Sequence, residues 1–318
     1  MKKRYLAWML TAVLAAGMLA GCSSQSAETT AAQETTAAET ADTTEAAGDT
    51  TEAVVDAAEE ANAAENAAGE AAKAEEAEEA SEGETEEILI AAAASLKNAF
   101  EEELIPMFQE QYPSIVVKGT YDSSGKLQTQ IEEGLEADVF MSAATTQMNA
   151  LDEEGLIASE TITDLLENKI VLIVPEGNEA GLSAFEDIAN AESIALGDPA
   201  SVPAGQYAEE ALTNLGLWDG IQDKVSFGTN VTEVLNQVAA ASADAGIVYA
   251  TDAASMEDQV DVVAEAPEGS LERKVIYPVA VVKNTAHAEA AQNLVDFLKT
   301  EEAMGVFASY GFAAGNEG

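Results

Sequence analysis

The chain has 318 residues, of which 59 are acidic and 13 are basic, so its formal charge at pH 7 is −46. It lacks the clustered lysines and arginines that hold a phosphate polyanion, so we expect no binding to nucleic acid. One Cys and one His cannot supply the ligands of a zinc or haem site, and a lone Cys forms no intramolecular disulfide. The fold must therefore rest on its apolar core.

The N-terminus has the pattern of an export signal. Residues 1–21 start with a basic cluster at residues 2–4, continue with an apolar stretch too short for a comfortable membrane span, and end in Leu-Ala-Gly before Cys22. This ending resembles the lipobox of bacterial lipoproteins, in which the Cys carries the lipid. The resemblance implies an extracytoplasmic protein anchored to the cell membrane by lipidation at Cys22. The alternative is an ordinary cleaved signal or a buried Cys.

Residues 22–87 are predicted to form an acidic, disordered tether. The segment consists mainly of Ala, Glu and Thr, and residues 23–87 include 20 acidic side chains and no aromatic one. So little apolar surface cannot offset the entropy lost on ordering. A solvated Ala/Glu helix over about residues 57–80 is the alternative, and in both cases the segment is a spacer.

From residue 88 onward, apolar runs alternate with segments of helical spacing. A short apolar run predicts a strand, and apolar residues three or four apart predict a helix. In the first half these patterns predict strands at 88–92, 115–117, 138–141 and 169–175, with helices over 96–108 and 127–135. The run at 169–175 is apolar throughout, which is typical of a strand covered on both faces.

The second half repeats the alternation. Strands are predicted at 193–196, 225–227, 246–249 and 275–282, and helices at 204–215, 231–238, 288–298 and 302–310. Such alternation predicts an α/β fold with mostly parallel sheets and right-handed crossovers.

Small residues and hydroxyls follow the predicted strands, where the next helices begin. They are Ser95, the pair at 123–124, Ala204, the turn at 229–231, and Tyr249 at a strand end. Ligands of α/β sheets bind beyond these strand ends, and the first N–H groups of each helix are free to contact an anion. Helix capping explains any one of these serines alone, so only the set indicates a site.

Several stretches resemble the molybdate-binding proteins, which are extracytoplasmic receptors of ABC transporters. The stretch Ala-Ala-Ala-Ala-Ser-Leu at 91–96 is similar to the opening of that family. Four further stretches are similar to it in the same order, at 123–127, 197–208, 246–249 and 277–282. The resemblance covers essentially the whole of residues 88–312.

This resemblance implies a two-lobe type II periplasmic-binding-protein fold. Lobe I would consist of residues 88–168 plus 279–318, and lobe II of residues 169–278. The chain would cross between them twice, near 167–169 and near 274–278. A tetrahedral oxyanion would be enclosed between the lobes.

The resemblance also implies the ligand and its contacts. High-affinity binding of molybdate, and of tungstate, would precede delivery to an ABC permease. The molybdenum would be bound only as its oxyanion, by a monomer without a cofactor. Another tetrahedral oxyanion such as sulfate or phosphate is the alternative. The donors would be the hydroxyl and N–H groups of Ser95 and Ser124, the N–H groups of Ala204 and Val231, and the hydroxyl of Tyr249.

Some residues favour other interpretations. Asp122 would repel a dianion, so we expect it to point away and cap the next helix, and we expect Lys126 to be a solvated helix residue.

His287 is expected at an exposed helix start, with no nucleophile that would make it part of an enzyme site. Tyr249 and Tyr277 could form a ferric–tyrosinate pair, although Tyr277 fits a structural role better. Besides a binding protein and an enzyme, a third functional class is a purely structural surface lipoprotein.

Overall fold

The structure is a computed structural model that describes residues 85–315. The predicted signal peptide, the predicted lipidation site Cys22 and residues 23–84 of the predicted tether lie outside the described residues. Strand β1 begins at Glu86, two residues earlier than expected. Glu86 and Glu87 pair with Ile115 and Val116 of the neighbouring strand, so these two residues belong to the fold.

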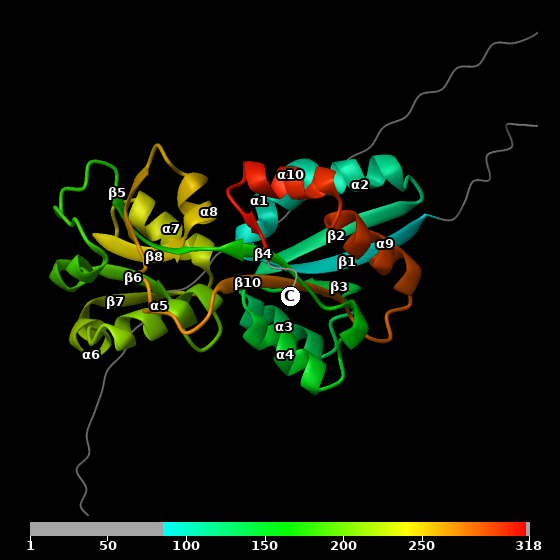
Figure 1. The fold of residues 1–318 in the computed structure, drawn as a ribbon, viewed down its shortest axis with the longest axis horizontal. Helices are drawn as coiled ribbons and strands as arrows, with labels where there is room; N and C mark the ends of the chain where they lie inside the picture. Colours follow the sequence, from blue (N-terminus) through cyan, green and yellow to red (C-terminus); the bar gives the residue numbers. More distant parts are fainter. Residues whose placement is uncertain (1–84, 316–318) are drawn as a thin grey trace, which may run out of the picture. The chain divides into compact units, whose positions relative to one another are not determined.

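The chain alternates strands and helices (Figure 1). The strands are β1 (Glu86–Ala93), β2 (Ile115–Asp122), β3 (Val139–Met141), β4 (Thr163–Asn168), β5 (Ile170–Pro175), β6 (Ile194–Gly197), β7 (Val225–Gly228), β8 (Ala245–Tyr249), β9 (Val260–Glu265), β10 (Val275–Val281) and β11 (Ala313–Ala314). The α-helices are α1 (Lys97–Ala99), α2 (Ile105–Gln111), α3 (Ser124–Glu132), α4 (Thr145–Glu153), α5 (Pro203–Asn214), α6 (Trp218–Ile221), α7 (Val231–Ala239), α8 (Ala250–Ala254), α9 (Ala288–Leu298) and α10 (Glu301–Ser309). Short 3-10 segments are η1 (Ala94–Leu96), η3 (Ser159–Thr161), η4 (Phe185–Asn190) and η5 (Gln222–Lys224), and η2 (Phe100–Leu104) is a π-helical turn.

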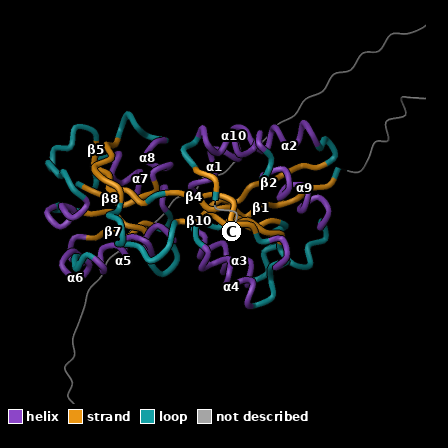
Figure 2. The backbone as a smooth tube through the Cα atoms, in the orientation of Figure 1, coloured by secondary structure: helices purple, strands orange, loops and turns teal. Residues whose placement is uncertain are grey.

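The strands form two sheets with helices packed against them (Figure 2). A six-stranded sheet has the order β11-β4-β10-β3-β1-β2, and a five-stranded sheet has the order β7-β6-β8-β5-β9. Each sheet is mixed: β1 pairs in parallel with β2 and β3, and β6 pairs in parallel with β7 and β8, whereas the remaining pairs are antiparallel. The predicted α/β class is confirmed. We call the six-stranded sheet with its helices the first lobe, and the five-stranded sheet with its helices the second lobe.

The chain passes between the two lobes twice. Strand β4 ends at Asn168 in the six-stranded sheet and β5 begins at Ile170 in the five-stranded sheet, so the first crossing lies within the predicted segment. The chain returns between Glu265 and Val275. Because β10 pairs with β4 from Val275 onward, the residues 275–278 lie in the six-stranded sheet, earlier than the lobe boundary expected at 278.

Burial follows the sequence patterns that predict these elements. Residues 170–174 of β5 are buried throughout, as expected for a strand covered on both faces. Helix α7 buries Val231, Val234, Leu235 and Val238, which share one helical face, and leaves the opposite face to solvent. Burial of such side chains contributes about 1.5–3 kcal/mol each, which is what holds the helix against its sheet.

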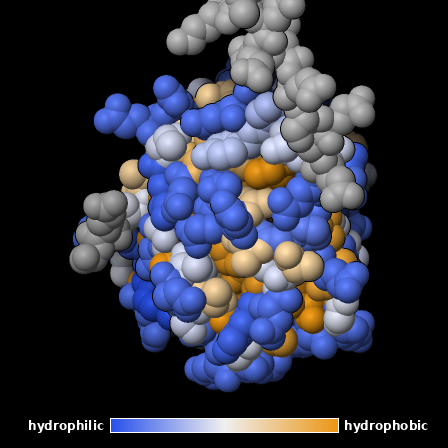
Figure 3. All heavy atoms as spheres, turned by 90° about the vertical axis from the view of Figure 1, so that its right-hand side faces the viewer, coloured by the Kyte–Doolittle hydropathy of each residue, from blue (hydrophilic) through white to orange (hydrophobic). Residues whose placement is uncertain are grey.

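The outer surface is largely polar. On the face that includes α9 and the start of β1, hydrophilic residues dominate and hydrophobic residues form interrupted patches between them (Figure 3). Within residues 85–315, every helix is too short or too polar to span a bilayer.

Candidate functional site

One pocket collects all of the residues that the sequence predicts as ligand donors. Residues from both lobes line it: Ala93, Ala94, Ser95, Asp122, Ser123, Ser124 and Ala143 from the first, and Val202, Pro203, Ala204, Val231 and Tyr249 from the second. The five predicted positions are distant in sequence, so the fold is what brings them together.

The pocket lies where helices begin. Helix α3 starts at Ser124, α5 at Pro203 and α7 at Val231, and their first residues line the pocket. The N–H groups of a first helical turn have no acceptor within their own helix, and they carry the positive end of the helix dipole. Three such termini aimed at one small space favour an anion there.

The pocket is narrow, because the lobes meet on either side of it. Its cavity volume is about 10 Å³, which is about what one water molecule requires. Across the lobes, the N–H of Gly125 donates to the carbonyl of Ser201 at 3.0 Å. The side-chain amide of Gln147 donates to Oε1 of Gln206 at 3.1 Å. The two lobes therefore contact each other directly beside the pocket.

Ser95 is held from behind by a polar network that the sequence did not indicate. Its Oγ lies 3.0 Å from the hydroxyl of Tyr277, which also accepts a hydrogen bond from Nδ2 of Asn168 at 3.3 Å. Asn168 Nδ2 also donates to Oγ1 of Thr251 at 2.9 Å. Tyr277 is fully buried on β10. It thus has a structural role, as expected, and that role includes positioning the hydroxyl of Ser95.

Ser124 is fully buried, and its Oγ accepts a hydrogen bond from the N–H of Ala143 at 3.0 Å. Because that oxygen acts as the acceptor, its own proton remains free to be donated. The neighbouring Ser123 is also buried, and within residues 85–315 its Oγ has no hydrogen-bond partner. A buried hydroxyl without a partner is costly, so Ser123 is a further candidate donor that the sequence did not separate from Ser124.

Tyr249 and Tyr277 lie side by side behind the pocket. Their ring centroids are 5.4 Å apart at an angle of 66°. Burial raises the pKa of both hydroxyls well above the usual value, and the nearby carboxyl of Asp252 adds to that effect. Hydrogen bonds with Ser95 and Asn168 oppose the shift at Tyr277. Both hydroxyls therefore keep their protons in the protein without a metal ion, and that of Tyr249 donates to the carbonyl of Ala143. In the part of the chain that the structure describes, no group of three His, Cys, Asp or Glu side chains could hold a metal ion.

Asp252, in the first turn of α8, is a buried acid close to these tyrosines. Burial raises the pKa of its carboxyl to about 7, although hydrogen bonds from the backbone N–H groups of Tyr249 and Asp252 itself oppose the shift. Its Oδ2 has no hydrogen-bond partner within residues 85–315. Sequence analysis does not single out this group, because a single Asp at a helix start is usually an exposed cap.

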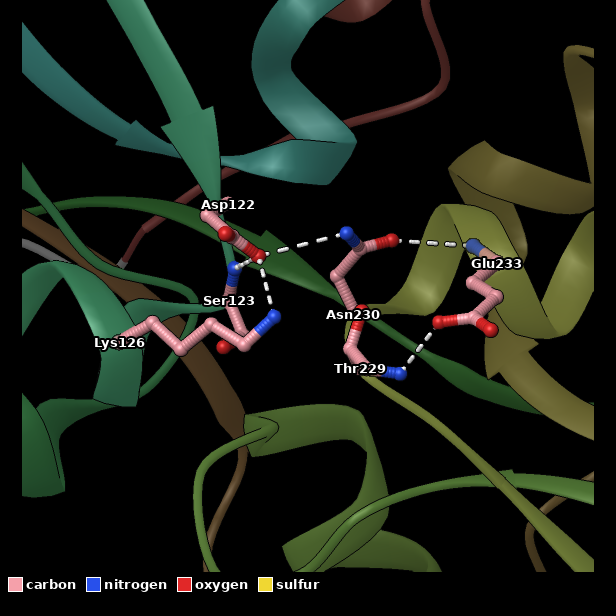
Figure 4. Close-up of polar contacts among 6 residues, drawn as sticks. All are labelled: Asp122, Ser123, Lys126, Thr229, Asn230 and Glu233. Atoms are coloured by element: carbon pink, nitrogen blue, oxygen red, sulfur yellow. Dashed lines mark hydrogen bonds and ion pairs between the residues drawn. The ribbon is translucent and has the colours of Figure 1, made fainter. Parts of the chain in front are cut away.

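Asp122 does not take the position expected from the sequence. The N-cap of α3 is Ser123, and no side chain caps that helix. Instead, Oδ1 of Asp122 accepts from the N–H of Ser123 at 2.8 Å, from Nζ of Lys126 at 3.3 Å and from Nδ2 of Asn230 at 3.3 Å (Figure 4). Lys126 is likewise not simply solvated, because it forms this ion pair. Asp122 is the one acidic residue among those that line the pocket.

His287 immediately precedes α9, as expected of a helix-start residue. Its Nδ1 lies 2.8 Å from Oε1 of Glu86, and it is not among the residues that line the pocket. The pocket therefore has no imidazole that could serve as a general base.

Comparisons with known proteins agree on one family. The profile of the bacterial extracellular solute-binding proteins matches residues 88–313. YvgL of Bacillus subtilis, provisionally named an ABC transporter substrate-binding lipoprotein, is 41% identical over 227 residues, which cover 71% of this chain and 86% of YvgL. The molybdate-binding protein ModA of Haemophilus influenzae is 39% identical over 236 residues, which cover 72% of this chain and 90% of ModA.

A solved structure shares both sequence and fold with the chain. It is the substrate-binding domain of a provisionally named molybdenum ABC transporter from Clostridium difficile, which is 38% identical with a TM-score of 0.56. The match covers 71% of this chain and 98% of that domain. The part of the chain that matches is the part that the structure describes.

Proposed function

The chain belongs to the bacterial extracellular solute-binding proteins, and from that premise we propose that its pocket binds molybdate, and tungstate, outside the cytoplasmic membrane for delivery to an ABC permease. The two mixed sheets and their helices form the type II periplasmic-binding-protein fold. Relatives that match nearly their whole length are named as molybdate-binding proteins. The ligand is then a tetrahedral dianion that carries no proton near neutral pH.

The observation that carries this proposal is the convergence of neutral donors from both lobes on one pocket. Two serine hydroxyls, a protonated tyrosine hydroxyl and the first N–H groups of three helices surround it. All of these groups donate hydrogen bonds. A fully deprotonated oxyanion accepts hydrogen bonds only, and hydrogen bonds to a charged group are the strong ones.

We propose specific contacts for the bound anion. Ser95 and Ser124 of the first lobe would each donate through the hydroxyl and the N–H. From the second lobe, the N–H groups of Ala204 and Val231 and the hydroxyl of Tyr249 would donate. Because the donors lie on two lobes, the anion stabilises the closed arrangement by bridging them.

The site is built for binding rather than for catalysis. A hydrolytic site needs a nucleophile within reach of a base. The hydroxyls of Ser95 and Ser124 have as partners Tyr277 and the N–H of Ala143, neither of which is a base. We therefore propose that the ligand leaves as it arrived, without a cofactor, and that the protein acts as a monomer.

We further propose that the protein is held at the membrane by a lipid on Cys22. The basic start, the apolar stretch and Leu-Ala-Gly before Cys22 support this assignment, and YvgL carries the name of a lipoprotein. The acidic segment that follows would let the binding lobes reach the permease. Replacement of Cys22 by Ser should release the protein from the membrane fraction, whereas a membrane-bound variant would contradict the lipid anchor.

Calorimetric titration with molybdate, tungstate, sulfate and phosphate tests the proposed ligand. We expect tight binding of molybdate and tungstate, at least a hundredfold tighter than phosphate, because nearly all of the proposed contacts are hydrogen-bond donors and the protonated oxygen of phosphate is a poor acceptor for them. Molybdate gains no proton between pH 6.5 and 8, so its own ionisation should not change the affinity in that range. Binding of phosphate alone, or of no oxyanion, would contradict the proposal.

A further inference from the structure

The contact between Asp122 and Asn230 joins the two lobes beside the pocket. Asp122 ends β2 of the first lobe, and Asn230 caps α7 of the second lobe. Nδ2 of Asn230 donates to Oδ1 of Asp122 at 3.3 Å (Figure 4). Asp122 itself lines the pocket and directly precedes Ser123, which also lines it. Asn230 directly precedes Val231, another lining residue.

The orientation of Asn230 is fixed by its own helix. Its Oδ1 accepts a hydrogen bond from the N–H of Glu233 at 3.0 Å, and Oε2 of Glu233 in turn accepts from the N–H of Thr229 at 2.6 Å. Because the carbonyl oxygen of the amide is engaged by the helix, its NH₂ group must face the opposite lobe. The start of α7 thus presents a donor to Asp122 in one defined direction.

The charge of Asp122 is offset where it stands. A carboxylate at the pocket would repel a dianion, but Oδ1 also accepts from Nζ of Lys126 at 3.3 Å and from the N–H of Ser123. Lys126 thus supplies a compensating positive charge, and because the Asp122 side chain is 29% exposed, solvent screens the charge that remains. The carboxylate can therefore stay beside the pocket as an acceptor for Asn230 without excluding an anion.

We propose that Asp122 and Asn230 are positioning residues that form a latch between the lobes and slow the release of the bound oxyanion. The latch acts on the closed state, in which the donors from both lobes reach the same anion. It should therefore change the dissociation rate more than the association rate. Its effect on the ligand rests on the proposed function, whereas the latch itself consists of protein groups alone.

Exchanging the two side chains tests the latch. In Asn230→Asp the carboxylate still caps α7, because Asp is as good an N-cap as Asn, but it faces Asp122 with a like charge. We expect release of molybdate to be roughly tenfold faster in stopped-flow experiments. The double variant Asp122→Asn/Asn230→Asp restores one donor and one acceptor at the wild-type net charge. Its release rate should return to within about threefold of wild type.

Two further variants separate the latch from added charge. Asn230→Ser keeps an oxygen that can cap α7, but it lacks the amide group and its shorter side chain cannot reach Asp122 while it caps, so release should be roughly fivefold faster without a change in charge. Asn236→Asp makes the same substitution at an exposed position of the same helix and should release molybdate at the wild-type rate. Asn236→Asp acting like Asn230→Asp would assign the effect to charge and overturn the latch.

Hydrogen exchange without ligand distinguishes failure of the latch from failure of the proposed function. In Asn230→Asp, peptides at the starts of α3 and α7 should exchange faster than in wild type, and the double variant should restore their protection. If wild type binds no molybdate, the proposed function fails while this exchange still decides the latch. If wild type binds molybdate but the double variant shows no recovery in release or exchange, the latch is wrong.

Discussion

The two lobes offer the pocket different kinds of donor. In the proposed contacts, the first lobe adds the side-chain hydroxyls of Ser95 and Ser124 to the main-chain N–H groups of the same residues, whereas the second lobe would donate through the main-chain N–H groups of Ala204 and Val231 and one hydroxyl, that of Tyr249. A side-chain donor can be removed by a single substitution, but a main-chain donor cannot. Substitutions of pocket residues will therefore reveal the contribution of the hydroxyls to binding, most of which belongs to the first lobe, and will conceal the contribution of the main-chain N–H groups of both lobes.

The lobes also hold their donors differently. A hydrogen-bonded network positions the first-lobe hydroxyls, with Tyr277 behind Ser95. In the second lobe, the first turn of α5 is positioned by close backbone contact with β6. A Cβ built on Gly205 would lie 2.1 Å from the carbonyl oxygen of Gly197, so only Gly permits that approach. A substitution can thus displace the main-chain donors of the second lobe by disturbing packing, although it cannot delete them.

Removal of both hydroxyls of the first lobe should have the largest effect on affinity. Each of Ser95→Ala and Ser124→Ala should weaken molybdate binding by about 1–3 kcal/mol, because a hydrogen bond to a charged group is lost. Calorimetry of the double variant should give a loss close to the sum. Ser226→Ala, at an exposed position on β7, is the matched control and should bind as wild type does. Wild-type affinity in the double variant would show that other loops hold the ligand.

Gly205→Ala should have the next largest effect on affinity, and it should reveal how much the main-chain N–H groups of the second lobe contribute to binding. The added methyl group forces α5 away from β6, which displaces the N–H of Ala204. We expect about 1–3 kcal/mol of lost stability and a weaker affinity of similar size. Gly220→Ala on α6 is the control, because a Cβ there meets nothing within 4 Å. Urea unfolding and calorimetry measure both quantities, and unchanged binding by Gly205→Ala would argue against the main-chain contact.

Asp252 marks another difference between the lobes. The buried Asp138 of the first lobe accepts from the N–H of Leu89 and the hydroxyl of Thr285, so both of its oxygens have partners. Asp252 of the second lobe leaves Oδ2 without one in the described residues. The burial of Asp252 is therefore an electrostatic cost that the first lobe avoids.

The cost at Asp252 should depend on pH. In the unfolded chain an Asp ionises near pH 4, whereas burial raises the folded-state pKa of Asp252 to about 7. Between these values the folded state binds more protons, so this group lowers the free energy of unfolding as pH rises from about 4 to about 7. Asp252→Asn should add on the order of 2 kcal/mol of stability at pH 8 and close to none at pH 4.5. An equal effect at both pH values in urea unfolding would contradict this assignment.

Tyr249→Phe should have the smallest effect. Its hydroxyl already donates to the carbonyl of Ala143 across the lobes at 3.3 Å, and an anion must compete for that proton. The ring that fills the pocket wall remains. We expect about 1 kcal/mol of lost affinity, less than for either serine. A loss larger than that of Ser95→Ala would reverse the ranking of the two lobes.

The sequence predicts those elements whose own residues carry a pattern. The apolar run of β5 and the amphipathic spacing of α7 are sufficient to identify them. Strand β4 has only two apolar residues, Leu165 and Leu166, between polar ones, and its pairing with β10 makes it a strand. Helix α4 is rich in Asn, Gln and Thr, and its burial of Met148 and Leu151 becomes visible only in the fold.

The candidate site likewise has a part that the sequence predicts and a part that it does not. The five predicted positions follow from helix starts and from the family resemblance, and they do meet at one pocket. The partners of these residues do not follow from sequence. The contact of Asp122 with Asn230 joins residues 108 positions apart, and that of Ser95 with Tyr277 joins residues 182 apart. The pairing of strands within the first lobe determines the contact of Ser95 with Tyr277, and the closure of the two lobes determines that of Asp122 with Asn230.

The most direct test of the central claim is a crystal structure of the protein with molybdate, in which anomalous scattering locates the molybdenum. The account predicts an anion between the lobes, with its oxygens at hydrogen-bond distance from Ser95, Ser124, Ala204, Val231 and Tyr249, and Lys126 still paired with Asp122. Molybdenum outside this pocket, or an oxyanion held by the ammonium group of a lysine, would contradict it.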